Sequence, residues 1–336
     1  MNGITILSTG RYIPEDCIAN EDFTKFVETS DEWIRTRTGI ATRHFANGEP
    51  TWYMGAMAAK AALERESIAP EQIDLVLVSC CTPDYLTPSV ACMIQRELGL
   101  KKAHCIDINC ACSGFVYGLD MARRYLNCGD EEIQTVLLVS AERLSQMLDF
   151  TDRSTCVLLG DGAGAVVVKR RENTIYAFSG GAIGESGEAL NAKYPRYESP
   201  FGNPETRKEC FEFPQVREKF LYMDGREVYR FSTRVFPELL RSCCGKLGLQ
   251  VSDLDHIIPH QANYRIVDTA MKALGLDEEE KKKVFLNLDK YGNTGSASIS
   301  IALDEMNSQG LLKRGDRMAV AGFGGGLTYA GIVFEW

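Results

Sequence analysis

The residue best suited to covalent chemistry is Cys112, one of twelve cysteines in the chain. It follows a strand-like run, Ala103–Asn109, and precedes apolar residues spaced as on an amphipathic helix. A cysteine at a helix N-terminus lies near unpaired N–H groups and the positive end of the helix dipole, which favour the nucleophilic thiolate. The sequence therefore predicts that Cys112 is a nucleophile, although a buried apolar cysteine fits the same local pattern.

A long internal repeat supplies partners for this cysteine. The segment Ile68–Ser79 matches Leu249–His260 at an offset of 181 residues, and the same offset carries Cys112 onto Asn293, which also precedes a helix of small residues. A period of this length predicts two fused, similar α/β halves rather than a solenoid. Equivalent helices of such halves pack face to face at the centre, so we expect Cys112, His260 and Asn293 to line one cavity.

Composition and charge narrow the class of protein. Alternating helix-like and strand-like segments over 336 residues predict an α/β protein with a cysteine-bearing half, 1–175, and a half carrying His and Asn, 176–336. No run approaches the length of a membrane span and no signal segment precedes the first strand, so we expect a cytoplasmic protein with reduced thiols. The net charge of −9 argues against nucleic acid and against an anionic membrane surface.

Cys110 and Cys112 together could serve a metal or a redox reaction instead. The pair has no second cysteine cluster at ligand spacing, and the four histidines are scattered. We therefore expect no metal, and a redox-sensing role stays as a weaker alternative to the nucleophile.

Four motifs stand in an order that resembles a known family. The motifs are Asn109–Phe115, His260–Asn263, Gly292–Ala297 and Phe323–Gly326. Together they resemble the thiolase-superfamily condensing enzymes, in particular the β-ketoacyl-acyl carrier protein synthase III family, nearly from end to end. The resemblance implies a thiolase-like fold of two pseudo-duplicated halves in a layered αβαβα architecture, assembled as a homodimer.

The same resemblance implies a reaction. Cys112 would take an acyl group from acyl-CoA, and the acyl-enzyme would condense decarboxylatively with malonyl-acyl carrier protein to give a 3-oxoacyl product, initiating fatty acid synthesis. No bound cofactor is implied, because the two substrates carry their own activation. The alternatives are a secondary-metabolism or ester-forming relative and a catalytically silent partner subunit; the three candidate catalytic residues together argue against the silent subunit.

Hydrogen-bond donors complete the expected site. The backbone N–H of Cys112 and one from the turn Gly324, Gly325 and Gly326 could converge on the acyl oxygen, since glycine lets backbone approach closely, although an ordinary turn between strands has the same glycines. By resemblance, His260 and Asn293 would donate to the malonyl thioester carbonyl and stabilise the enolate that forms on loss of CO2.

Five further positions match the family's substrate-binding residues. Trp33, Arg37 and Arg153 match positions that hold the nucleotide end of CoA, where adenine stacks against an aromatic ring and a guanidinium. Asn263 and Arg265 match positions near the pantetheine arm and the tunnel mouth. The alternative for Trp33 is a core residue on a helix face.

Two departures from the family pattern bear on the primer. Thr87 stands where relatives specialised for short primers often have an aromatic residue at the floor of the acyl pocket, so we expect primers longer than acetyl to be accepted. The segment Lys193–Phe220, rich in prolines and aromatic residues, predicts an ordered flap beside the tunnel or a decoration at a dimer edge.

An acidic carrier protein needs a basic surface on this acidic chain. Candidates are Arg265 and Lys272 on the helix after His260, and Arg230 and Arg234 on the preceding helix. The run Lys281–Lys283 is a further candidate, with a solvated face as its alternative.

Overall fold

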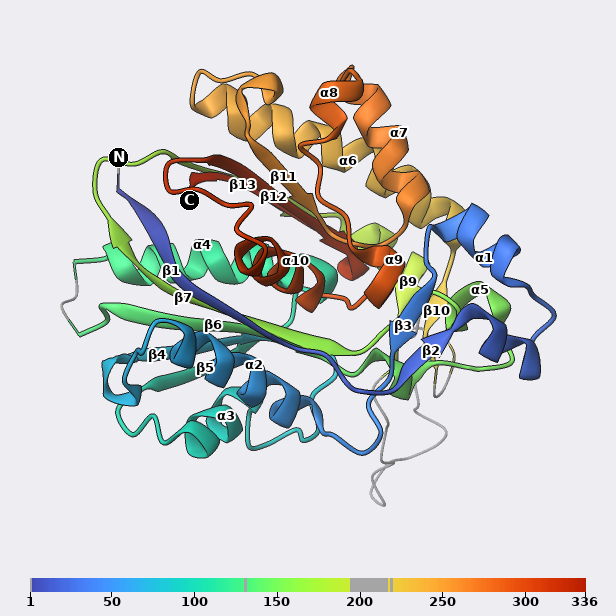
Figure 1. Cartoon of the computed structure of the whole chain (residues 1–336), viewed down its shortest axis with the longest axis horizontal. Helices are drawn as coiled ribbons and strands as arrows, with labels where there is room; N and C mark the ends of the chain where they lie inside the picture. The colour runs from blue at the N-terminus through green and yellow to red at the C-terminus, as the bar shows by residue number, and fades with distance from the viewer. Residues whose placement is uncertain (1, 130–131, 194–216, 218–219) are drawn as a thin grey trace, which may run out of the picture.

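The computed structural model describes residues 2–129, 132–193, 217 and 220–336, which form five layers of alternating helix and sheet (Figure 1). Two mixed sheets enclose a central helical layer, and further helices cover the outer face of each sheet. The predicted αβαβα architecture is therefore confirmed. Among the described residues no helix is long and apolar enough to cross a membrane.

The first sheet has the strand order β1-β7-β6-β4-β5. Strands β4, β5 and β6 are parallel, while β7 runs antiparallel to both of its neighbours. All of β4 and β6 is buried, as in strands covered on both faces. The strands are β1 (Gly3–Tyr12), β4 (Leu75–Ser79), β5 (His104–Ile108), β6 (Thr135–Glu142) and β7 (Gly162–Arg171).

The second sheet repeats this pattern in the order β8-β13-β12-β11. Again one strand, β13, runs antiparallel to both neighbours, and the pair β11 and β12 is parallel. Strands β4 and β11, which end the two copies of the repeat, hold equivalent places. The strands are β8 (Tyr176–Ala182), β11 (His256–Pro259), β12 (Arg317–Gly324) and β13 (Thr328–Glu335).

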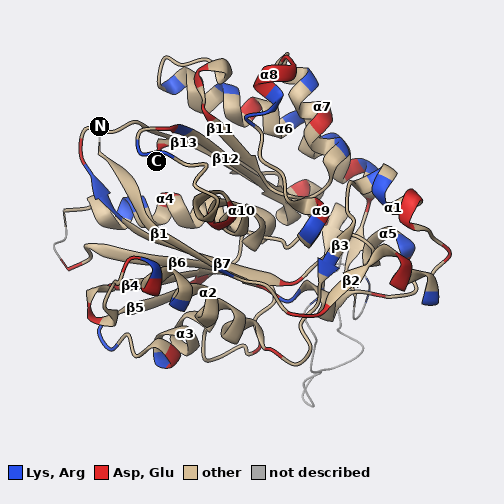
Figure 2. Ribbon diagram, viewed as in Figure 1, with Lys and Arg blue, Asp and Glu red and all other residues tan. Residues whose placement is uncertain are grey.

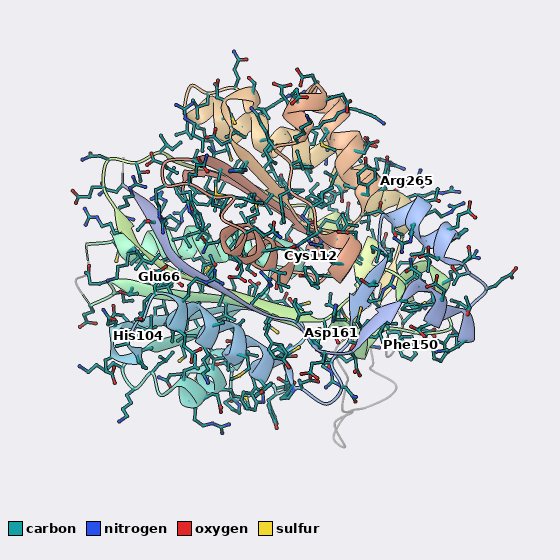
Figure 3. All side chains as sticks on the ribbon, viewed as in Figure 1. Glu66, His104, Cys112, Phe150, Asp161 and Arg265 are labelled. Carbon is teal, nitrogen blue, oxygen red and sulfur yellow. The ribbon has the colours of Figure 1, made fainter. Side chains whose placement is uncertain are left out.

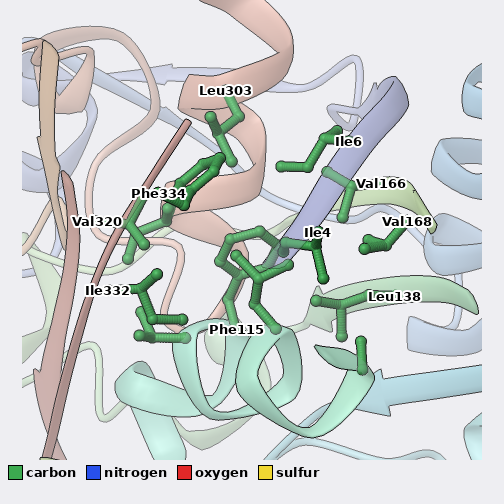
Figure 4. Close-up of a cluster of buried hydrophobic side chains, with 14 of the residues drawn as sticks. Ile4, Ile6, Phe115, Leu138, Val166, Val168, Leu303, Val320, Ile332 and Phe334 are labelled. Carbon is green, nitrogen blue, oxygen red and sulfur yellow. The ribbon is translucent and has the colours of Figure 1, made fainter. Parts of the chain in front are cut away.

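Helices α4 (Gly114–Asn127) and α10 (Ala297–Ser308) form the central layer between the two sheets. Apolar side chains of both helices fill the space between the sheets; Phe115 of α4 and Leu303 of α10 meet Ile4 of the first sheet and Phe334 of the second (Figure 4). Because α10 is buried along ten of its residues, its serines face protein rather than water. The central layer therefore fixes where both helix N-termini lie.

The outer layers and the periphery complete the fold. Helices α2 (Thr51–Arg65) and α3 (Val90–Leu98) cover the first sheet, and α6 (Gly225–Lys246) and α7 (Tyr264–Leu274) cover the second. The remaining elements gather beside one end of the sheets, except α8, which follows α7 (Figure 1). They are β2 (Cys17–Ala19), α1 (Asp31–Thr38), β3 (Thr42–His44), α5 (Arg153–Cys156), β9 (Leu190–Asn191), β10 (Tyr222–Met223), α8 (Glu278–Lys281) and α9 (Leu288–Tyr291).

Candidate active site

Cys112 lies at the centre of the molecule, in the short 3-10 turn Ala111–Ser113 that joins β5 to α4 (Figure 3). The turn is tightly held, because the hydroxyls of Ser113 and Thr328 both donate to the carbonyl of Cys110, at 2.7 and 2.9 Å. Ala111 has a φ of 44°, a conformation that costs a residue with a side chain free energy. The strained turn presents Cys112 directly before the N-terminus of α4, as the sequence predicted.

The glycine turn after β12 lies against the cysteine. A Cβ atom on Gly324 would be 2.7 Å from Cys112 Cβ and 3.0 Å from its backbone nitrogen. One on Gly325 would meet Ala111 at 3.4 Å, and Gly326 has a φ of 126° that favours glycine. The backbone of Gly324 therefore lies so close to Cys112 that there is no room for a side chain at position 324. The carbonyl oxygen of an acyl group on Cys112 would lie near the backbone of this turn.

The electrostatic surroundings of Cys112 act against its ionisation. Burial raises the pKa of the Cys112 thiol to about 12, and the nearby carboxylate of Glu142 adds to the increase. The helix N-terminus acts in the opposite direction, but it does not outweigh a desolvated site facing a negative charge. The resting cysteine is therefore a thiol, and its role as the nucleophile stays a prediction.

His260 follows the last residue of β11 and is 1% exposed. Its backbone N–H donates to Ala321 of β12 at 2.7 Å, and its ring meets that of Phe323 edge-on at 5.5 Å. Burial lowers the pKa of His260 to about 3, so the ring is neutral at physiological pH. A neutral imidazole can donate a hydrogen bond without acting as a charged group.

Ser298 of α10 contacts one ring nitrogen of His260. Its Oγ lies 2.7 Å from Nδ1 of His260 and also accepts the N–H of Gln261, at 3.4 Å. When the Ser298 hydroxyl donates to Nδ1, the neutral ring carries its proton on Nε2. That proton is the one a substrate carbonyl would accept.

Asn293 is held by the other half of the molecule. Its backbone N–H donates to Leu158 and its carbonyl accepts the N–H of Gly160, both at 2.9 Å. The side-chain Oδ1 accepts the N–H of Gly295 at 2.9 Å, which fixes the amide orientation and leaves Nδ2 to donate elsewhere. Asn293 thus presents a donor in a fixed orientation.

The N-termini of α4 and α10 meet at the site. A Cβ on Gly114, two residues after Cys112, would lie 3.6 Å from Cβ of Ser296, three residues after Asn293. His260 contacts the same helix α10 through Ser298, and the same strand β12 that carries Gly324. The structure thus brings the three candidate catalytic residues to one place from two halves of the chain.

Trp33 of α1 carries two guanidinium groups over its ring. Those of Arg37 and Arg153 lie 4.9 and 4.5 Å from the ring centre, and Arg153 also donates to the carbonyl of Glu28. The three predicted CoA-binding residues are therefore side by side on α1 and α5. An adenine ring could stack on Trp33 where one guanidinium now lies, provided that side chain turns away.

Asn263 and Arg265 begin helix α7, beside α1. Asn263 is the N-cap, and its side chain accepts the backbone N–H of Arg265 at 2.8 Å, so its amide oxygen already has a structural role. Arg265 is exposed on the side of the molecule that carries α1 (Figure 3). Tyr264, 46% exposed, packs against Gly39 at the end of α1 and joins the two elements.

The positions of the other predicted surface residues do not test their predicted roles. Thr87 is exposed in the loop between β4 and α3, so within a single chain it does not close a pocket, and its role stays a prediction. Most of the 193–220 segment lies outside the described residues. Lys281 and Lys282 pair with Glu278 and Glu279 of their own helix.

The other predicted basic residues lie close to acidic neighbours on their own helices: Arg230 to Glu227, Arg234 to Glu238 and Lys272 to Asp268. Blue and red stretches of ribbon accordingly lie close together along α7 and α8 (Figure 2). Each of these basic residues has an acidic neighbour, whereas Arg265 is an exposed cation beside α1 with no ion pair among the described residues.

A small apolar cluster provides surroundings for an acyl chain. Leu190 lies against Gly325 of the glycine turn. It packs with a cluster built on Leu144, Leu148, Leu159 and Leu221. Two cavities of about 530 and 390 Å³ lie away from this site, one between α2 and α3 and the other between α6 and the end of α7.

Sequence reasoning missed the residues that support the nucleophile and its partners. Glu142, Ser296, Ser298 and Phe323 are all buried next to Cys112, His260 or Asn293. The signal was present in part, because Ser296, Ser298 and Ser300 alternate with apolar residues at the start of helix α10. Among the described residues no three His, Cys, Asp or Glu side chains are grouped as metal ligands would be.

Two duplicated halves, with a cysteine and an asparagine before the facing helices α4 and α10 and a histidine at the end of β11, are the arrangement of a thiolase-like condensing enzyme. The family described as 3-oxoacyl-[acyl-carrier-protein (ACP)] synthase III matches residues 106–186, and its C-terminal family matches 244–336. The chain belongs to the β-ketoacyl-acyl carrier protein synthase III family.

The individual relatives agree along the whole chain. The chain is 43% identical to beta-ketoacyl-[acyl-carrier-protein] synthase III of Clostridium acetobutylicum, over 100% of this chain and 99% of the relative. It is 40% identical to that of Clostridium novyi over the full length of both. The crystal structure of 3-oxoacyl-[acyl-carrier-protein] synthase III from Aquifex aeolicus VF5 is similar with a TM-score of 0.88 and 40% identity, over 99% of this chain and 100% of that one.

Proposed function

We propose that the protein loads an acyl group from acyl-CoA onto Cys112 and condenses it with malonyl-acyl carrier protein, giving a 3-oxoacyl-acyl carrier protein that initiates fatty acid synthesis. The observation that supports this proposal is the meeting of the N-termini of α4 and α10: Gly114, two residues after Cys112, lies against Ser296, three residues after Asn293, and His260 contacts Ser298 of α10. Membership of the family supports the same reaction.

Loading is a transfer between thioesters. The sulfur of Cys112 attacks the acyl carbonyl of acyl-CoA, the bond to the CoA sulfur breaks, and the proton of the Cys112 thiol ends on the departing CoA. Backbone N–H groups of Cys112 and of the turn containing Gly324 would stabilise the oxyanion. Stabilising this charge matters here because the thiol is not ionised at rest.

Condensation uses the two other donors. The malonyl group loses CO2, and the electron pair of the broken bond becomes an enolate on the thioester carbonyl. Nε2–H of His260 and Nδ2–H of Asn293 would donate to that oxygen. The enolate carbon then attacks the acyl group on Cys112, and the sulfur leaves to take up a proton again. Two neutral donors suffice, and no bound cofactor is required.

CoA and the carrier protein would enter on the side of α1 and α7. Trp33, Arg37 and Arg153 would hold the nucleotide, while Asn263 and Arg265 would lie along the pantetheine arm. The exposed cation of Arg265 suits an acidic carrier protein.

A homodimer would complete the first sheet. Strand β5 is at the edge of that sheet, and the nearby loop exposes Tyr85 (53%) and Leu86 (79%). An unpaired edge beside exposed apolar side chains suits pairing with a second copy. Sedimentation equilibrium of the full chain measures this directly.

The decisive experiment separates loading from condensation. The protein is incubated with acyl-CoAs of increasing chain length, and intact mass detects the acyl-enzyme. Malonyl-acyl carrier protein is then added and the product identified. We expect Cys112→Ser to abolish loading and Cys110→Ser to leave both steps intact. Loading on another residue, or an ester product, would refute the proposal.

A further inference from the structure

A buried carboxylate joins the two halves of the protein next to the active site. Glu142 is the last residue of β6 and has no exposed surface. Strands β4, β5 and β6 are parallel, so their carboxyl ends lie at the same edge of the sheet. Glu142 therefore lies beside Cys81, which follows β4, and near Cys112, which follows β5.

The hydrogen bonds of Glu142 reach both halves of the chain. From the first half, the hydroxyl of Thr82 donates to Oε2 at 2.6 Å, and the N–H and thiol of Cys81 donate at 3.1 and 3.3 Å. From the second half, the hydroxyl of Ser296 donates to Oε1 at 2.6 Å. Four donors surround one carboxylate, which is the arrangement that a buried charge requires.

Ser296 connects this carboxylate to the condensation machinery. It is 1% exposed, directly precedes α10, and lies in the same turn as Asn293. Gly295, whose N–H orients the Asn293 side chain, also packs on Glu142: a Cβ on Gly295 would lie 3.2 Å from Cγ of Glu142. The carboxylate thus contacts the residues that hold Asn293, and it lies at the positive end of a helix, where a negative charge is favourable.

Activation of the nucleophile is not what this carboxylate contributes. Among the described residues its hydrogen bonds go to Cys81, Thr82 and Ser296 and not to Cys112. Its charge also disfavours ionisation of the Cys112 thiol. Glu142 therefore does not activate Cys112. Its hydrogen bonds instead connect it to the turn that contains Asn293.

We infer that Glu142 is a positioning residue for condensation: through Ser296 and Gly295 it holds the Asn293 turn in register with Cys112. The inference rests on the proposed function, because it concerns the step in which Asn293 donates to the enolate. Loading of Cys112 would use backbone donors of Cys112 and of the Gly324 turn, which are not among the hydrogen-bond partners of Glu142 in the described residues.

The test compares the two half-reactions in Glu142→Gln, Ser296→Ala and the double variant. Glutamine keeps the shape of Glu142 but offers only one acceptor oxygen, so one donor loses its partner. We expect condensation of preloaded enzyme with malonyl-acyl carrier protein to fall about 10- to 100-fold in all three variants. Loading should stay close to the wild-type rate in Ser296→Ala, which keeps the charge of Glu142. Loading should not fall in Glu142→Gln, because the charge that opposes the Cys112 thiolate is then removed. The double variant should lose little beyond Glu142→Gln, because both changes break one link.

Ser300→Ala is the matched control. Ser300 is buried on the same helix, and its hydroxyl donates to the carbonyl of Ala297 rather than to Glu142. We expect it to retain both half-reactions, and thermal unfolding of every variant shows whether it is folded. Ser296→Ala removes a single oxygen and keeps the test valid if Glu142→Gln fails to fold.

Four outcomes would overturn the inference. Equal losses of loading and condensation in Ser296→Ala and Glu142→Gln would mean that Glu142 has a general structural role. Unchanged condensation in these variants would mean that Glu142 does not position Asn293. Condensation lost equally in Ser300→Ala would mean that the helix, not the link, is sensitive. A wild-type protein that loads but never yields a 3-oxoacyl product would refute the proposed function itself, and this inference with it.

Discussion

At the scale of single residues, the structure explains how neutral groups can perform an anionic reaction. His260 is buried and neutral, Asn293 is an amide, and the thiol of Cys112 is protonated at rest. A charged acid in this desolvated space would be costly. The site therefore depends on neutral donors held in fixed orientations. Ser298 contacts the His260 ring, and Gly295 orients the Asn293 amide.

The neutrality of His260 gives a pH prediction. Because burial lowers its pKa to about 3, the ring does not gain a proton as pH falls from 8 to 5. We expect the rate of malonyl decarboxylation by preloaded enzyme to show no titration near the ordinary histidine pKa of about 6.5. Single-turnover measurements across this range check it; a fall in rate with a midpoint near that value would contradict it.

Ser298 provides a second prediction at this scale. Ser298→Ala removes the hydroxyl that contacts Nδ1 of His260, so the ring no longer has this partner. We expect decarboxylation to slow by about tenfold with loading unchanged. In a His260→Ala background the same change should have no further effect, and an additive loss there would show that Ser298 acts elsewhere.

At the scale of elements, the meeting of β12 with the turn before α4 is the closest contact of the site. Gly324 and Cys112 approach so closely that no side chain fits between them. Strand β12 also carries Phe323 against His260. One strand therefore sets the distance of both the nucleophile and the histidine from the glycine turn.

Gly324→Ala should disrupt that contact. The added methyl group would lie 2.7 Å from Cys112 Cβ, so either the glycine turn or the nucleophile must move. We expect loading to fall about 100-fold, the typical cost of losing one oxyanion donor. Intact-mass time courses measure the rate. Gly245→Ala, in open space on helix α6, is the control and should load normally.

At the scale of the whole molecule, the duplication explains why the site lies where it does. Equivalent helices α4 and α10 pack between the sheets, and their N-termini meet only because both halves are present. The central layer is also the most continuous part of the core. Stability and catalysis thus depend on the same interface.

Primer selection is the prediction made for Thr87, which is exposed in the loop between β4 and α3. A small side chain at this position predicts that primers longer than acetyl are accepted. We expect a series of acyl-CoAs to load chains beyond acetyl, and Thr87→Phe to shorten the accepted range. Loading of acetyl alone by the wild-type protein would show that another residue limits the pocket.

The sequence by itself determined the duplication, the three candidate catalytic residues and the family, because a repeat and four ordered motifs are written in residue order. Only the tertiary structure decided the ionisation of Cys112, the contact of His260 with Ser298 and the place of Glu142. Those properties depend on burial and on partners from distant segments, such as Glu142 and Ser296, which lie 154 residues apart in the chain and 2.6 Å apart in space. Desolvation and hydrogen bonding depend on which residues are close in space. The spacing of residues within one strand or helix therefore cannot predict them.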